Sequence, residues 1–326
     1  MRKHLFFALP LMACADPSVQ SLQPSAVELS PTCDITIPMT LPANGARAAD
    51  YLAPIEFHLS EPDPTATVIA PFSGVQGSRD EGRVITFTPS TPLAPLTTYT
   101  VGLEYCHGTP QITFQTGEFG APLEIPTANL EGRTFALGLA QGNWPTGGEG
   151  LSALAASLFS TELLLEVVEV EEREIALRVG LPAEDDGTQD YCSRTLDLPV
   201  GTFDGPRFRI ATPALSFGAF QDQLAISNLV VEGSFNPEGT AIGSGTVTAT
   251  IDTRSLYDML AVYGPELLCD MASDFGVPCT PCEADGAPFC FTVSATHLEG
   301  QLEWDLSVDI VEEAWLDPRC ESAEVL

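Results

Sequence analysis

The stretch "REIALRVGL", residues 173–181, decides the fold class of the larger part of this chain. Its apolar residues alternate with the polar residues Glu174 and Arg178, and they are Ile175, Leu177, Val179 and Leu181. Because successive side chains of a strand point to opposite faces, the stretch predicts an antiparallel strand with one dry face and one solvated face.

The same alternation recurs in "TVTATID" (246–252), "FCFTVSA" (289–295) and "QLEWDLSVDI" (301–310), which we expect to be strands. Two stretches predict helices instead, residues 149–160 and residues 253–264, the second ended by a glycine. A long antiparallel meander with one or two helices predicts that residues 124–326 form a barrel or half-barrel closed over a helix. A second sandwich is the competing architecture. The fold class is therefore mainly β.

Residues 27–122 contain shorter β-type stretches, separated by Pro, Gly and Ser clusters. The expected inward-facing residues are Ile55, Phe57, Leu59, Ile85, Phe87, Tyr99, Val101, Leu103, Tyr105, Ile112 and Phe114. Short strands at this spacing, with turn signals between them, predict a β-sandwich.

Four motifs of this region resemble the C-terminal half of the bacterial SbsA-type Ig-like domain. They are an F-x-P turn at Phe87–Pro89, an L-x-P corner at Leu93–Pro95, a T-x-Y-x-V strand at Thr97–Val101 and a final F-x-T at Phe114–Thr116. The upstream "IEFHLSEP" is similar to an early strand of that family, although His58 and Leu59 depart from the pattern. The resemblance implies a spacer or adhesive module without an active site.

The N-terminus has the layout of a secretory signal, with the basic "MRKH" followed by the apolar "LFFALPLMA". This apolar stretch is far shorter than the roughly 20 residues that span a bilayer as a helix. Leu11–Cys14 resembles the bacterial lipoprotein box, in which the cysteine becomes the lipidated first residue. We therefore expect residues 1–13 to be a signal peptide, Cys14 to carry lipid, and residues 14–26 to form a polar tether.

Nine cysteines leave an odd one in an exported protein, and assigning Cys14 to lipid leaves eight. An even number suits disulfides in an oxidising compartment. Cys33 and Cys106 are the two cysteines between residues 27 and 122 and are expected to pair. The other six allow fifteen connectivities. Short local loops favour Cys269–Cys279 and Cys282–Cys290, with Cys192–Cys320 as a tie near the C-terminus.

The same six cysteines have two alternative interpretations. The spacing C-x₉-C-x₂-C-x₇-C within residues 269–290 offers four thiolates to zinc, and "CTPC" (279–282) is typical of a redox site. A zinc ribbon needs a second CxxC, and a thioredoxin-like site needs a βαβ pattern, neither of which is found in the sequence. Disulfides are favoured over both, and no metal or cofactor is expected.

The charge is strongly negative, with 45 acidic and 13 basic residues. Residues 1–13 hold Arg2, Lys3 and no acidic residue, so the remainder has 11 basic against 45 acidic residues, a net charge of −34. Such a polyanion repels phosphate backbones, which excludes nucleic acid as a partner. The charge indicates either solubility or the attraction of divalent cations or a basic partner.

No catalytic constellation is found among the four histidines His4, His58, His107 and His297, and no HExxH, G-x-S-x-G or phosphate-loop motif is present. "GSGTVTATIDTRS" (243–255) brings Asp252 into an aspartic-protease-like context, but Arg254 stands where that loop needs glycine, so a strand leading into a capped helix is preferred. The acidic "PAEDDGTQD", with Asp185 and Asp186, predicts a solvated turn, with calcium binding as the alternative.

Together these features predict a non-enzymatic protein of the bacterial cell envelope, lipid-anchored and exposed to the periplasm or the cell surface. In this interpretation an Ig-like spacer presents a disulfide-tied β domain for binding or structure. The alternative is a carrier that encloses an apolar ligand in the second domain. A third hypothesis, an acidic hydrolase, has the least support. The partners left open are the membrane, an envelope protein, a divalent cation and an apolar ligand.

Overall fold

The computed structural model describes residues 33–139, 142–144, 162–183, 187–217, 224–255, 264–274, 277–314 and 317–320. The chain divides after Asp34 into two units, and all the strands lie in the second, Ile35–Leu326. The fold is mainly β, as the sequence predicts. Cys14, Asp185, Asp186 and the expected helix at 149–160 lie outside the described residues.

The N-terminal strands form two small antiparallel sheets. One contains β1 (Met39–Leu41), β2 (Ile55–His58), β5 (Val84–Pro89) and β4 (Gly74–Arg79); the other contains β3 (Thr67–Ile69), β6 (Thr98–Glu104) and β7 (Gln111–Gln115). Between β4 and β5 lies a short 3₁₀ turn, Asp80–Gly82. The two sheets share one core, to which the first contributes Ile55, Phe57, Ile85 and Phe87 and the second Val101, Leu103, Ile112 and Phe114. This is the expected sandwich arrangement.

The proline corner of this sandwich is held by hydrogen bonds. The Tyr99 hydroxyl accepts a hydrogen bond from the Ala94 amide at 2.9 Å, and the buried Thr116 hydroxyl donates to the Ala94 carbonyl at 2.7 Å. The L-x-P, T-x-Y and F-x-T motifs therefore meet at one corner, which gives their spacing a physical reason.

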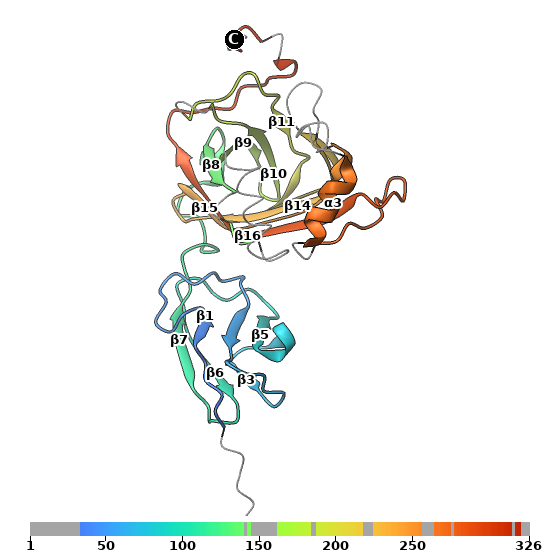
Figure 1. Ribbon diagram of the computed structural model, residues 1–326. Coiled ribbons are helices and arrows are strands. Elements are labelled where there is room, and N and C mark those ends of the chain that lie inside the picture. The colour runs from blue at the N-terminus through green and yellow to red at the C-terminus, as the bar shows by residue number, and fades with distance from the viewer. Residues whose placement is uncertain are drawn as a thin grey trace, which may run out of the picture. The chain divides into compact units, whose positions relative to one another are not determined.

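The C-terminal strands close into an eight-stranded antiparallel barrel (Figure 1). Its strands are β8 (Thr134–Gly138), β9 (Glu162–Val170), β10 (Glu174–Gly180), β12 (Gly201–Asp204), β13 (Arg207–Phe217), β14 (Leu224–Phe235), β15 (Ala241–Asp252) and β16 (Cys290–Glu303). β10 pairs with β9 on one side and with β12 on the other, while β16 pairs with β8, so the ring is complete. The short β11 (Leu196–Asp197) adds to β10, and a 3₁₀ turn, Thr127–Leu130, precedes β8. Because this sheet closes on itself, the competing prediction of a second β-sandwich for residues 124–326 is wrong.

The two ends of the barrel differ in their connections. At one end the turns 171–173, 205–206 and 236–240 are short, and we call this the floor end. At the opposite end the connections are 139–161, 181–195, 218–223 and 253–289, and we call this the long-loop end. The helix α3 (Pro265–Asp274), which the sequence analysis missed, belongs to the last of these connections. The helix expected at 253–264 is described as helical only at residues 253–255.

The strand expected at 301–310 is wrong beyond Glu303, where β16 ends. Asp305 has a positive φ of 66°, and Trp304 and Ile310 are 74% and 55% exposed. The following segment lies over the outside of β10, where the Arg178 guanidinium donates to the Val308 carbonyl at 3.2 Å. Val308 is therefore buried against the outside of the barrel, while Trp304 and Ile310 are exposed, and none of the three faces the interior as a strand would require.

The segment 306–314 is tied to the connection between β10 and β11 by paired hydrogen bonds. The Gln189 amide donates to the Asp309 carbonyl at 2.8 Å and accepts from the Asp309 amide at 2.7 Å, and the Thr195 hydroxyl accepts from the Val311 amide at 2.8 Å. The disulfide Cys192–Cys320 fixes the same pair of segments further along the chain. Among the described residues, no helix is long and apolar enough to span a membrane.

We predict that the disulfide Cys192–Cys320 contributes more to stability than the local disulfide Cys269–Cys279. In the chain-entropy description, a loop of 128 residues is worth about 5 kcal/mol, and the 10-residue loop closed by Cys269–Cys279 about 3 kcal/mol. Urea unfolding of the double variants Cys192→Ala/Cys320→Ala and Cys269→Ala/Cys279→Ala measures the two losses. Equal losses would contradict the prediction.

A second prediction concerns Glu166, a buried carboxyl on the outer face of β9. Burial raises the pKa of Glu166 above its ordinary value of 4.5, and Arg178, whose Nη1 lies 3.6 Å from Glu166 Oε2, opposes that shift. An acid whose pKa is raised by folding loses stability as the pH rises from its unfolded value through the folded one. The free energy of unfolding should therefore fall relative to Glu166→Gln as the pH rises above 4.5. The control is Glu169→Gln, at an exposed position of the same strand, and a pH-independent difference between wild type and Glu166→Gln would contradict the prediction.

Candidate ligand-binding site

The barrel encloses an apolar cavity of about 150 Å³. Its lining comes from strands on all sides of the barrel and from the connections at the long-loop end. The lining residues are Leu137, Leu139, Trp144, Leu163, Leu165, Val179, Leu196, Leu198, Leu215, Ile226, Leu229, Val231, Val247, Ala249, Ile251 and Val293.

Strand pairing explains how these side chains meet. Val231 and Ile226 on β14 stand opposite Val247 and Ile251 on β15, and Ala249 stands opposite Val293 on β16. Residues two apart on one strand share a face, so the alternation read from the sequence directs each set to the barrel interior. The predicted strands thus supplied Val179, Val247, Ala249, Ile251 and Val293 to the cavity wall.

The described residues that line the cavity offer no side-chain charge and no carboxylate, hydroxyl or amide group to a ligand. They are aliphatic except for Trp144, whose ring N–H donates to the Leu139 carbonyl at 3.2 Å. A polar group placed inside would lose its hydrogen bonds to water without replacement, at a cost of about 1–3 kcal/mol or more. The described lining is therefore chemically compatible with hydrocarbon.

A cluster of phenylalanines closes the floor end. The Phe235 ring lies 5.5 Å from Phe135, 6.4 Å from Phe203 and 5.4 Å from Phe208 between ring centroids, and all four side chains are buried. Ile242 and Ile210 complete this packing. The described side chains thus pack closely at the floor end, and the cavity lies between this cluster and the long-loop end.

At the long-loop end, α3 packs against the wall of the cavity. Leu268, Ala272 and Val277 belong to the same core cluster as Ala249 and Ile251. The disulfide Cys269–Cys279 joins α3 to the segment that follows it. The helix is therefore held at the end of the barrel where the cavity lies.

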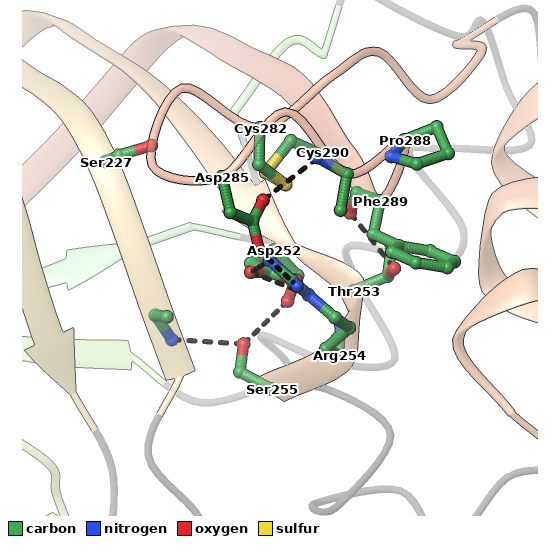
Figure 2. A network of polar contacts seen from close by, with 12 residues as sticks. Ser227, Asp252, Thr253, Arg254, Ser255, Cys282, Asp285, Pro288, Phe289 and Cys290 are labelled. Atoms are coloured by element: carbon green, nitrogen blue, oxygen red, sulfur yellow. Dashed lines mark hydrogen bonds and ion pairs between the residues drawn. A yellow bond between two sulfur atoms is a disulfide. The ribbon is translucent and has the colours of Figure 1, made fainter.

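Figure 2 shows a polar network at the end of β15, one residue beyond Ile251. The Asp252 carboxylate accepts from the Arg254 guanidinium at 2.9 and 3.1 Å to Nε and 2.6 Å to Nη2. It also accepts from the Arg254 backbone amide at 3.0 Å. The last is the contact of an N-cap residue. Arg254 Nη1 reaches Asp285 at 2.6 Å, which fixes the 282–290 loop to the strand end.

This network settles the role of the protease-like stretch. The carboxylate of Asp252 is held by Arg254, the residue that departs from the catalytic pattern, and it caps the helical turn at 253–255. The expected strand leading into a capped helix is confirmed at its described start. The ion pairs hold the pKa of Asp285 below its ordinary value.

The eight cysteines expected in disulfides are disulfide-bonded, including Cys33 and Cys106. Three bridges follow the connectivity favoured by short loops: Cys192–Cys320, Cys269–Cys279 and Cys282–Cys290. Asp252 lies near the sulfurs of Cys282 and Cys290, but a disulfide supplies no thiolate to a metal. Neither zinc nor dithiol chemistry fits these cysteines in this state.

The histidines described by the structure do not converge. His58 contacts Glu56, which also pairs with Arg79 at 2.6 Å, on β2 and β4 of the sandwich. His107 lies beside Tyr105, and His297 contacts the Thr296 hydroxyl on β16. Each has a local partner, and none lines the cavity.

Several lining residues escaped the sequence analysis. Leu215, Ile226 and Leu229 lie on β13 and β14, in stretches that were not recognised as strands. A weak alternation was present there, but Asn228, with a φ of 51°, shifts the pairing between Ser227 and Val230 and breaks the period. Trp144 carried no signal at all, because it lies outside the regular strands.

Comparisons with known proteins do not identify a family. No family model matches the chain, and no curated protein matches it. Among solved structures, it is similar to an L,D-transpeptidase from Mycobacterium smegmatis at 12% identity and a TM-score of 0.23, over 61% of this chain and 76% of that one. A likeness this weak carries no argument about function, so the site must be interpreted from its own geometry.

Proposed function

We propose that this protein is a non-enzymatic, lipid-anchored cell-envelope protein whose barrel binds an apolar ligand. The observation that carries the binding role is the closed barrel with a cavity whose described lining residues are all apolar. Eight strands are enough to hold one small ligand inside a barrel. The alternative function raised by the sequence thus has direct geometric support.

Energetics favour an occupied cavity over an empty one. Unfilled core volume costs about 24 cal/mol per Å³, so a void of 150 Å³ corresponds to roughly 3–4 kcal/mol. Water is a poor filler because it would find almost no hydrogen-bond partners there. A hydrocarbon group restores the missing contacts and gains from its own removal from water.

The cellular setting follows from the cysteines. Disulfides are typical of proteins in an oxidising, extracytoplasmic location. The lipoprotein-box resemblance at Leu11–Cys14 supports an anchor, and the motifs at residues 87–116 support an SbsA-type Ig-like spacer between anchor and barrel. The local partners of the histidines and of Asp252 support a binding role over an enzymatic one.

We predict that the barrel binds 1-hexanol inside the cavity. Titration of the full chain should change the emission of Trp144, and Trp144→Phe should remove that change. Ala249→Phe fills the cavity and should weaken binding at least tenfold, while Ala211→Phe makes the same change at an exposed position of β13 and should leave binding intact. Unaltered binding in Ala249→Phe, or none in the wild type, would favour a purely structural module.

We further predict that Cys14→Ser abolishes lipidation. Mass spectrometry of the wild-type protein should find an acylated N-terminal cysteine, and the variant should accumulate as an unlipidated precursor outside the membrane fraction. Unchanged membrane fractionation of the variant would contradict the anchor while leaving the barrel's binding role untouched.

A further inference from the structure

We propose that the ligand group bound in the barrel is a single unbranched alkyl chain, inserted end first to a depth of about six carbons, with its polar end outside the cavity. This rests on the proposed binding function and specifies its ligand class. Three observations carry it: the size of the cavity, its length, and the difference between the two barrel ends.

The volume sets the number of carbons. A cavity of about 150 Å³ lined by Leu, Ile and Phe takes a six-carbon molecule such as benzene. The present cavity has the same volume and a similar lining. A whole lipid is far too large, so only part of a longer molecule can lie inside.

The length of the lining sets the shape of the group. On β15 the wall runs from Val247 to Ile251, four residue steps or about 13 Å along the strand, and a strand tilt of about 35–45° leaves roughly 10 Å along the barrel axis. Spread over that length, 150 Å³ gives a cross-section of roughly 15 Å². This is narrow enough for one carbon chain and too narrow for fused rings.

The asymmetry of the ends sets the direction. The floor end has short turns and the packed ring of Phe135, Phe203, Phe208 and Phe235. Because this packing closes the floor end, a chain enters from the long-loop end with its apolar terminus directed toward the floor. The described wall residues offer no polar side chain that could bind a headgroup, so the polar end of the molecule stays outside.

A homologous series of straight 1-alkanols, from butanol to decanol, tests the proposal on the full chain. Affinity should rise about fourfold with each added methylene while carbons enter the cavity, and the increase should flatten beyond about six carbons. 1-Adamantanol carries the same hydroxyl on a fused-ring skeleton and should bind at least tenfold more weakly than 1-hexanol.

Val231→Ala should move the chain length at which the affinity stops rising to a longer alcohol. Val231 lines the cavity and packs against both core clusters of the barrel, so removing two methyl groups there should extend the tight-binding range by one or two carbons. Val308→Ala removes the same atoms from a buried position outside the barrel wall and should leave that chain length unchanged.

The alcohol series distinguishes a failure of the proposed binding function from a failure of the alkyl-chain inference. If neither linear nor cyclic alcohols bind in the cavity, the proposed binding function fails. If 1-adamantanol binds as tightly as 1-hexanol, or affinity climbs without a break to decanol, the alkyl-chain inference is overturned while the binding function stands.

Discussion

The pairing of β8 with β16 is the contact on which the rest of the barrel depends. It joins the two ends of a meander into a ring, so backbone groups that an open sheet would leave at its edges are hydrogen-bonded. It also separates an inside from an outside. Alternation along each strand then becomes a division between the cavity wall and a solvated surface, and the register of every pair decides which apolar residues meet.

Closure of the sheet does not determine how side chains fill the interior, and the packing differs between the two ends of the barrel. The floor end is packed with aromatic rings beneath short turns. Toward the long-loop end the described inward residues are Leu, Val, Ile, Ala and Trp144, and a cavity of about 150 Å³ remains between them. Stability and ligand space are therefore assigned to different layers of one sheet, and packing changes in the floor layer need not alter the cavity.

Local sequence patterns predicted many of the strands and the disulfides. The features they missed depend on contacts between residues far apart in the sequence. The strands at 174–180 and 246–252 followed from strict alternation, and the three barrel disulfides followed from short loops and a terminal tie. Closure, by contrast, depends on partners far apart in the sequence. The pattern at 301–310 misled because Val308 packs against the outer face of the barrel, a burial that alternation cannot distinguish from an inward one. The cavity is a volume, and no residue type signals it.

The cross-links lie where packing is sparse. Cys192 belongs to the β10–β11 connection, and Cys269, Cys279 and Cys282 belong to the β15–β16 connection, so all three barrel disulfides fix segments of the long-loop end. A hollow interior forgoes roughly 3–4 kcal/mol of contacts, and each bridge contributes a similar amount by restricting the unfolded chain. Covalent restraint can therefore offset the missing core without occupying the space that a hydrocarbon chain needs. This division explains how a barrel that contains a cavity of about 150 Å³ can stay folded without a ligand.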